Sequence, residues 1–176
     1  MKFFTLKLYN LLGESIDGEG GLPEFKAAFA QYQAHINKLS GLLEPDLVLF
    51  SEPFLIDDAL LVSAELSRVL RTLDIVLRCG NLQVGYFDAE IHYGGVHMEP
   101  KDEEALTAIA GWTTTRLGEA DAYAHEIDLT DDALIEHSML FHPGIELSVS
   151  CQRLTWNRTD RPNRELPNLE SRLVVS

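Results

Sequence analysis

The stretch that decides the fold is ALIEHSMLFHPGIELSVSCQRLTW, residues 133–156. Side chains on a strand alternate between two faces, so pairing outward from the tip at His142-Pro143-Gly144 sorts them into two sets. The first set is apolar apart from one histidine: Ile135, His137, Met139, Phe141, Ile145, Leu147, Val149 and Cys151. The second is mostly polar: Leu134, Glu136, Ser138, Leu140, Glu146, Ser148, Ser150 and Gln152. The pattern predicts one long antiparallel hairpin, because a slip of one residue would bury the polar set.

Length and cysteine content indicate an ordinary globular domain. A chain of 176 residues can bury about two thirds of its unfolded surface, so it needs no disulfide or metal to stay folded. Cys79 and Cys151 both fall on apolar strand faces. We therefore expect two free, buried thiols in a reducing cytoplasm, with a disulfide between neighbouring strands as the alternative.

The charge of the chain is −14, and it is unevenly spread. Residues 153–172 carry five arginines and a net charge of +2, which leaves −16 on the rest. Such a surface repels phosphate backbones, which argues against nucleic acid as a partner. It is compatible with a basic partner protein, although acidity also serves solubility. No signal peptide and no apolar run of ~18 residues is present, so we expect a cytoplasmic protein that does not bind membranes.

The first part of the chain is predicted to be helical. Apolar residues recur at helical spacing over residues 22–39, with Pro23 in the first turn and Gly41 as a stop. A short helix is expected over residues 46–51. Residues 2–12 fit either a short strand or a first helical turn, and the glycine-rich residues 17–21 fit a linker.

The sequence between residues 57 and 79 supports two interpretations. Val62, Leu66, Val69 and Leu73 fit a helix capped by Asp57 or Asp58. The alternation of apolar residues from Leu73 to Cys79 instead fits a strand.

The remaining elements are clearer. We expect strands over residues 84–93 and 120–129. A helix from Asp102 should turn Leu106, Ile109, Ala110 and Trp112 to the core. After Trp156 the polar residues predict an extended C-terminal tail, residues 157–176, in which Leu173–Val175 either docks or frays.

Several short motifs occur in a recognisable order: LIDDA at 55–59, YFDAEIHYGGV at 86–96, HEID at 125–128, EHSMLF at 136–141 and GIEL at 144–147. In this order the chain resembles a family of small bacterial proteins known only as a domain of unknown function. Members often carry Leu-His-Asp-Ala at the first motif; this chain has Leu-Ile-Asp-Asp-Ala there and lacks the family's histidine. The resemblance implies no activity. It does imply two strands, 59–66 and 70–79, and we adopt that interpretation.

Histidines and carboxylates gather towards the C-terminal end, and these residue types suit zinc or manganese. The candidate catalytic residues of a small metal-dependent hydrolase are Glu126, Asp128, Glu136, His142 and Glu146. The candidate metal ligands are His125, Asp88, Glu90 and His92. However, the hairpin register sends Glu136 and His137 to opposite faces, and no strong metal motif is present. We therefore expect no metal and no cofactor, and His137 is predicted to be a hydrogen-bonded core residue.

Together these patterns predict a single α+β domain over residues 1–156, with a helical layer (1–54) on a mostly antiparallel, meander-like sheet (55–156). The helix at 22–39 is expected to cover the apolar face of the hairpin. If it cannot, a homodimer would be needed to bury the rest. The favoured function is a non-catalytic protein-interaction module, of the inhibitor or immunity type, whose acidic surface binds a basic protein.

Overall fold

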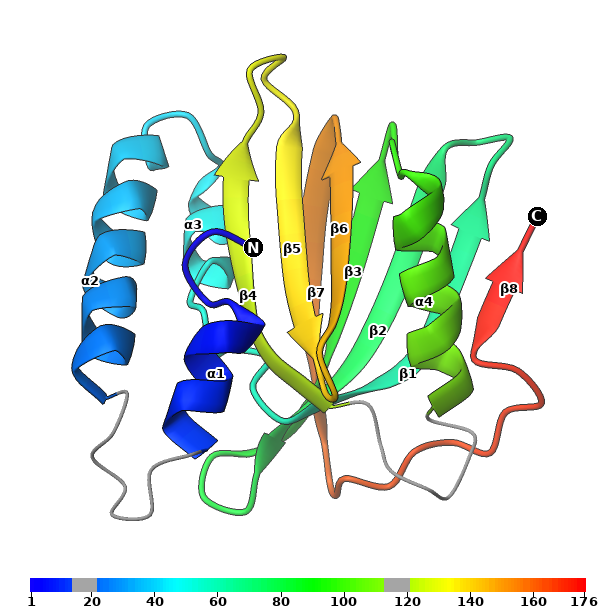
Figure 1. Ribbon diagram of the computed structural model, residues 1–176. Helices are drawn as coiled ribbons and strands as arrows, with labels where there is room; N and C mark the ends of the chain where they lie inside the picture. The colour runs from blue at the N-terminus through cyan, green and yellow to red at the C-terminus, as the bar shows by residue number, and fades with distance from the viewer. Residues whose placement is uncertain (14–21, 113–120) are drawn as a thin grey trace.

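The computed structural model describes residues 1–13, 22–112 and 121–176. Within these ranges the chain is α+β, with four helices and an eight-stranded, mostly antiparallel sheet (Figure 1). The helices are α1 (Leu6–Gly13), α2 (Leu22–Leu39), α3 (Pro45–Phe50) and α4 (Pro100–Trp112). The strands are β1 (Ala59–Ser67), β2 (Thr72–Asn81), β3 (Gly85–Gly94), β4 (Asp121–Leu129), β5 (Ile135–Phe141), β6 (Ile145–Cys151), β7 (Arg153–Arg161) and β8 (Leu173–Val175).

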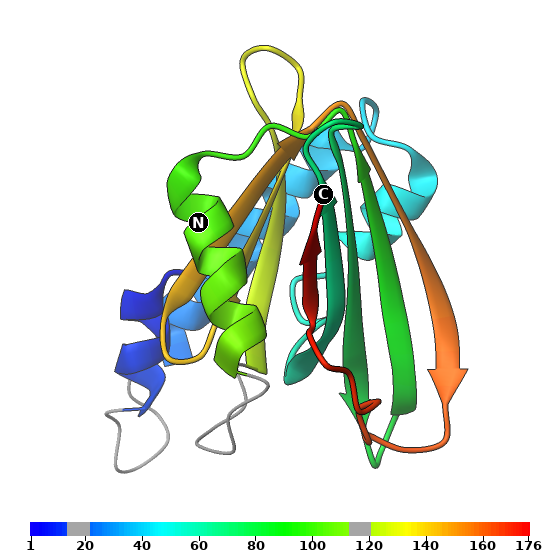
Figure 2. The ribbon, with the colours of Figure 1, turned by 90° about the vertical axis from the view of Figure 1, so that its right-hand side faces the viewer.

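The sheet is folded into two leaves. Its strand order is β6-β5-β4-β1-β2-β3-β7, with β8 added beside β1. Strand β4 pairs with β1 only at Ala59–Ala122 and Leu60–Asp121. Beyond that junction β4-β5-β6 and β1-β2-β3-β7 diverge, as the view along the sheet shows (Figure 2). We call the faces turned towards the other leaf inner faces, and those turned away outer faces.

The predicted hairpin register is confirmed by the pairs Phe141–Ile145, Met139–Leu147 and His137–Val149. The hairpin itself is shorter than expected. It ends at Cys151, because Arg153 pairs with Gly94 on the other leaf and begins β7. The intervening Gln152 donates its backbone N–H to the Gly94 carbonyl at 3.0 Å. Residues 153–156 therefore belong to the second leaf.

The bend at Gln152 depends on a neighbouring glycine. Gly95 has a φ of +65°, and a Cβ on it would lie 2.7 Å from Oε1 of Gln152. A side chain at position 95 would therefore be strained and would displace Gln152. This close approach lets β6 continue into β7 with a single residue between them.

Residues 57–79 form two strands and no helix, as the resemblance implied. The helical interpretation was wrong because the apolar residues of β2, from Leu73 to Cys79, pair in alternation with β3. Leu73 lies opposite Tyr93 and Ile75 opposite Ile91. The turn between β1 and β2 contains Arg71 with a φ of +54°, which ends the first strand.

Helix α2 has the predicted bounds, but it packs against β4 and not against the apolar face of the hairpin. The Tyr32 hydroxyl accepts the backbone N–H of Ile127 at 2.8 Å. His137, on the hairpin's apolar face, instead contacts Phe50 of α3 and Tyr93 of β3. The chain thus covers this face itself, which removes the argument for a homodimer based on it.

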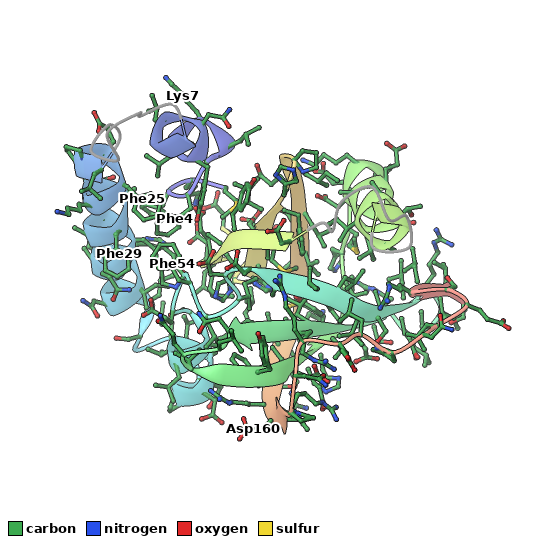
Figure 3. All side chains as sticks on the ribbon, turned by 90° about the horizontal axis from the view of Figure 1, so that it is seen from below. Phe4, Lys7, Phe25, Phe29, Phe54 and Asp160 are labelled. Atoms are coloured by element: carbon green, nitrogen blue, oxygen red, sulfur yellow. The ribbon has the colours of Figure 1, made fainter. Side chains whose placement is uncertain are left out.

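An aromatic cluster joins the N-terminal helices to the sheet. The rings of Phe4, Phe25, Phe29 and Phe54 gather on the side of α2 that faces the sheet, whereas Lys7 points away from them (Figure 3). Phe54 is stacked with both Phe25 and Phe29, at ring separations of 5.5 and 5.8 Å. Residues 2–12 supply a buried Phe4 and then helix α1, so of the two alternatives the helical one is confirmed. The glycine-rich residues 17–21 lie outside the described residues.

Helix α4 lies along β6 at the end of the sheet. Its Asp102 carboxylate accepts the backbone N–H of Ser148 at 3.1 Å, and Leu106, Ile109 and Ala110 are buried as predicted. The side chain of Trp112 lies outside the described part of the chain. The helix therefore protects an edge strand that would otherwise offer unpaired backbone groups.

The C-terminal residues are more ordered than a simple tail. Strand β7 runs to Arg161, so the expected boundary at Trp156 falls within it, and Leu173–Val175 docks in parallel on β1. The segment between them is held by Arg172, which donates to the carbonyls of Leu61 and Val62. None of the described helices combines the length and apolar character that a membrane span requires.

Candidate functional site

The carboxylate of Glu126 holds the start of the chain. Its oxygens accept the backbone N–H groups of Lys2 at 2.7 Å, Phe3 at 2.7 Å and Phe4 at 2.6 Å. Glu126 is 5 % exposed and lies on the outer face of β4. Three donors leave little of this carboxylate for chemistry, so it acts as a structural clamp.

Asp128, two residues further along β4 and on the same face, also holds the N-terminal segment. It accepts hydrogen bonds from His35 Nε2 at 2.9 Å and from the backbone of Leu129 at 2.8 Å, and it pairs with the Lys2 ammonium. Burial alone would raise its pKa, but the hydrogen bonds from Lys2, Leu129 and His35 outweigh it and lower the pKa below 3.8. Asp128 is therefore an ion-pair partner and a poor proton acceptor.

The other three catalytic candidates are dispersed. Glu136 lies directly across from Asp128 on β5, partly exposed. His142 is at the exposed hairpin tip, where its ring bonds to the Tyr123 hydroxyl. Glu146 is at the start of β6 and pairs with the amino group of Met1. Only Glu126, Asp128 and Glu136 come together, around the Lys2 ammonium.

The outer face of β3 carries three of the four candidate metal ligands. Asp88 is 2 % exposed and lies between Arg78 and Arg161, whose Nε is 2.6 Å from Oδ2. Glu90 accepts from the Thr159 hydroxyl at 3.1 Å. His92 Nδ1 is 2.6 Å from Oδ1 of Asp74. Each candidate has its own partner.

The fourth candidate ligand, His125, belongs to a buried chain of hydrogen bonds on the inner faces. His125 Nε2 lies 2.7 Å from the Glu52 carbonyl, which can only accept. The neutral ring must then accept through Nδ1, which lies 3.0 Å from Nε2 of His137. His137 in turn accepts at Nδ1 from the Tyr93 hydroxyl at 2.7 Å. The carbonyl thus fixes one direction for the whole relay.

Both imidazoles are fully buried and neutral. Desolvation lowers the pKa of His125 to about 4, against the opposing effect of the Glu52 carbonyl. Desolvation and then the neighbouring His125 lower the pKa of His137 well below 6.5. His137 is thus the hydrogen-bonded core residue that the hairpin register predicted. Phe50 packs against both imidazoles and Glu52 follows α3, so the relay holds Phe50 and the end of α3 in place.

The described residues contain no group of three or more histidine, cysteine or acidic side chains arranged to hold a metal ion. The hydrolase candidates lie on two outer faces, at the hairpin tip and inside the core. Cys79 and Cys151 are free and buried, as expected, and burial raises the pKa of each thiol to about 12. A thiol in that environment is a poor nucleophile.

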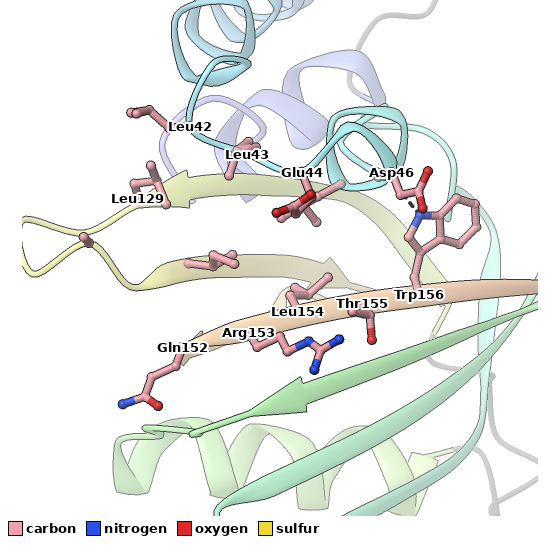
Figure 4. A pocket seen from close by; sticks show the side chains of 13 residues that line it. Leu42, Leu43, Glu44, Asp46, Leu129, Gln152, Arg153, Leu154, Thr155 and Trp156 are labelled. Atoms are coloured by element: carbon pink, nitrogen blue, oxygen red, sulfur yellow. Dashed lines mark hydrogen bonds between the residues drawn. The ribbon is translucent and has the colours of Figure 1, made fainter.

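A cleft of about 910 Å³ opens between the two leaves beside α3 (Figure 4). Its lining comes from the α2–α3 connection, α3, the β4–β5 turn and the β6–β7 bend: Leu42, Leu43, Glu44, Asp46, Leu47, Leu129, Ala133, Ile135, Gln152, Arg153, Leu154, Thr155 and Trp156. Glu44 and Asp46 are exposed, and so are Asp131 and Asp132 in the adjoining turn. Glu44 and Asp46 line the hollow, whereas Asp131 and Asp132 lie in the turn between its lining residues Leu129 and Ala133; the four carboxylates are here called the cleft rim.

The sequence analysis named none of the cleft residues as a site. Leu43, Leu47 and Leu154 were not singled out, and β7 was placed partly in the hairpin and partly in the tail. The feature of the sequence that could have indicated this site is its pairs of acidic residues, Glu44 with Asp46 and Asp131 with Asp132. The two pairs lie about 85 residues apart in the sequence. Only the fold brings them together.

No family model matches the chain, and comparisons with curated proteins and with solved structures found no significant similarity.

Proposed function

We propose that the protein is a non-catalytic protein-interaction module, of the inhibitor or immunity type, that binds a basic partner protein through its acidic surface. The observation that supports this best is the cleft rim. The ion pairs among the described residues use other carboxylates: Asp74, Asp88, Glu99, Glu103, Asp128, Glu146 and Asp160. The rim carboxylates are thus left available for a partner's lysines and arginines.

The positions of the catalytic candidates also support a binding role. Glu126, Asp128 and Asp88 are already held by amide groups, lysine or arginine of the same chain. A reaction that drew such a carboxylate away would leave lysine, arginine or backbone N–H groups without their partner. These carboxylates are therefore suited to a structural role. The geometry gives no comparable support to a metal-dependent hydrolase.

The test is affinity capture at low and high salt with a rim variant, Glu44→Gln, Asp46→Asn, Asp131→Asn and Asp132→Asn. A matched control removes four exposed carboxylates elsewhere: Glu24→Gln, Glu65→Gln, Glu104→Gln and Glu170→Gln. We expect a basic protein to be retained by the wild type and the control and lost by the rim variant and at high salt, because exposed charges are screened. Retention that ignores both salt and the rim charges would contradict the proposal.

A further inference from the structure

We propose that the cleft receives a large apolar side chain of the partner, on a segment in which lysine or arginine flanks that side chain. This inference rests on the proposed function and adds the chemistry of the segment that binds. A rim of carboxylates alone would fit any cation. The hollow behind the rim adds the requirement for an apolar anchor.

The hollow has two apolar walls. Leu43 and Leu47 come from the helical side, and Leu154 from β7; all three are less than 9 % exposed. Leu129 and Ile135 form the opposite wall, on β4 and β5. Pockets that bury a small ligand hold about 300–1,000 Å³, so this cleft can take an aromatic side chain with part of its flanking backbone.

Trp156 is held ready for an apolar contact. Its Nε1 donates to the Asp46 carbonyl at 3.0 Å, and its ring packs against Phe50 with the centroids 5.1 Å apart. The indole donor is therefore satisfied, and Trp156 lines one end of the hollow beside Asp46 (Figure 4). Fixed aromatic rings in desolvated pockets are typical of the residues that dominate binding energy.

Leu42 marks the mouth of the cleft. It lines the hollow and is 73 % exposed, which leaves a large apolar side chain in water. Leu49, on α3, is 70 % exposed but does not line the cleft. The chain thus offers a matched pair of exposed leucines, one inside the proposed contact and one outside it.

The charges select a cationic segment. Glu44 and Asp46 are the acidic residues of the lining, and Arg153 is its one cation; Asp131 and Asp132 are exposed in the adjoining turn. The lining thus carries a charge of −1, and the adjoining turn adds two negative charges. This excess of negative charge repels acidic ligands and attracts lysine or arginine on either side of the anchor. Each flanking cation then stays partly in water, where it loses little hydration.

The experiment uses three synthetic peptides and calorimetric titration. The first is basic with a central phenylalanine, Lys-Lys-Gly-Phe-Gly-Lys-Lys; the second replaces phenylalanine by alanine; the third replaces every lysine by glutamate. We expect the first to bind at least about fivefold more tightly than the second, as burial of an aromatic ring predicts. The third should bind weakest.

Variants then locate the binding. Leu42→Gln should weaken binding of the phenylalanine peptide about fivefold, and Leu49→Gln should leave it unchanged. Glu44→Gln combined with Asp46→Asn should weaken both basic peptides. Leu42 and Leu49 are 73 % and 70 % exposed, so neither substitution is expected to unfold the chain, and thermal unfolding of both variants checks this.

The outcomes separate this inference from the proposed function. Equal binding of the two basic peptides, equal effects of the two leucine variants, or no binding at millimolar peptide would overturn the apolar anchor. Salt-sensitive capture that depends on the cleft rim would still support the binding function in each of these cases. Tighter binding of the acidic peptide would overturn the charge requirement.

Discussion

At the scale of single residues, the most constrained group is the relay from Tyr93 to the Glu52 carbonyl. Each member of the relay has one role: Tyr93 donates, the two imidazoles each donate and accept, and the carbonyl accepts. Buried polar groups of this kind cost free energy when one partner is removed, because the remaining partner has no water to replace it.

The first prediction concerns the centre of this relay. His137→Phe should lower the free energy of unfolding by about 2–4 kcal/mol, since the Tyr93 hydroxyl and His125 Nδ1 both lose a partner. Urea denaturation measures the change. The control is His92→Phe, at a half-exposed position, which should cost less than about 1 kcal/mol. Equal costs for the two variants would contradict the relay.

The second prediction concerns Asp88. Its carboxylate lies between Arg78 and Arg161, with Arg78 and Asp88 both buried. Asp88→Asn should lower stability by about 3–5 kcal/mol, because it leaves a buried guanidinium without a counter-charge. The matched change Asp74→Asn, in an exposed pair with His92, should cost less than about 1 kcal/mol. Thermal unfolding of both variants checks this difference, and a small cost at Asp88 would disprove it.

At the scale of elements, the backbone N–H groups of residues 2–4 are attached to β4 by one carboxylate, that of Glu126. We predict that Glu126→Ala frees residues 2–4 and increases hydrogen exchange at the amides of Lys2, Phe3 and Phe4, because their common acceptor is gone. Amides of β5 and β6 should keep their protection. Glu136→Ala, on the neighbouring strand, is the control. Unchanged exchange at residues 2–4 in Glu126→Ala would show that the clamp contributes nothing.

The same elements show what a sequence can and cannot predict. The register of β5 and β6 was predictable because their alternation places only apolar residues on one face, with His137 as the one exception. The nature of residues 57–79 was not predictable from periodicity, since Leu66, Val69 and Leu73 fit a helix while the alternation from Leu73 to Cys79 fits a strand; the resemblance decided it. Strand β7 was missed because its edge position leaves it mostly exposed, with Leu154 its only buried residue.

The candidate site was predictable by residue type but not by role. Carboxylates such as Glu126 and Asp128 stand out in the sequence, yet their partners Lys2 and His35 lie more than 90 residues away. A carboxylate that is bound by backbone amides cannot be distinguished, from a single sequence, from a carboxylate that is free to react. The contacts that distinguish them exist only after folding.

At the scale of the whole molecule, the two buried histidines predict a stability that falls in acid. Their pKa values in the folded state lie below the ordinary 6.5, so the unfolded chain binds more protons as the pH falls. Their contribution is complete above pH ~6.5 and is lost as the pH approaches about 4. Between pH 7 and 5 each should cost about 2 kcal/mol.

One acidic residue works against this trend and can be removed. Desolvation and the neighbouring Asp58 and Asp121 raise the pKa of Asp57 to about 6, so its contribution grows as the pH falls. Because Asp57 is exposed, the effect is weakened by solvent. In Asp57→Asn, denaturation at several pH values should show the histidine effect alone, steeper than in the wild type. A stability independent of pH from 7 to 5 in this variant would contradict neutral, buried histidines.

The bend at Gln152 has a consequence for how two copies of the chain could meet. The two leaves cross over at this single residue; β7 pairs with β3 alone along its length, and β8 after it pairs with β1. If Gln152 straightened, β7 would swing away from its own β3 and could pair with β3 of a second copy, in a domain exchange that keeps every ladder. The wall of the cleft formed by Leu154 and Trp156 would then come from the other chain. A side chain at position 95 would strain the bend, so a substitution of Gly95 is expected to favour this exchange.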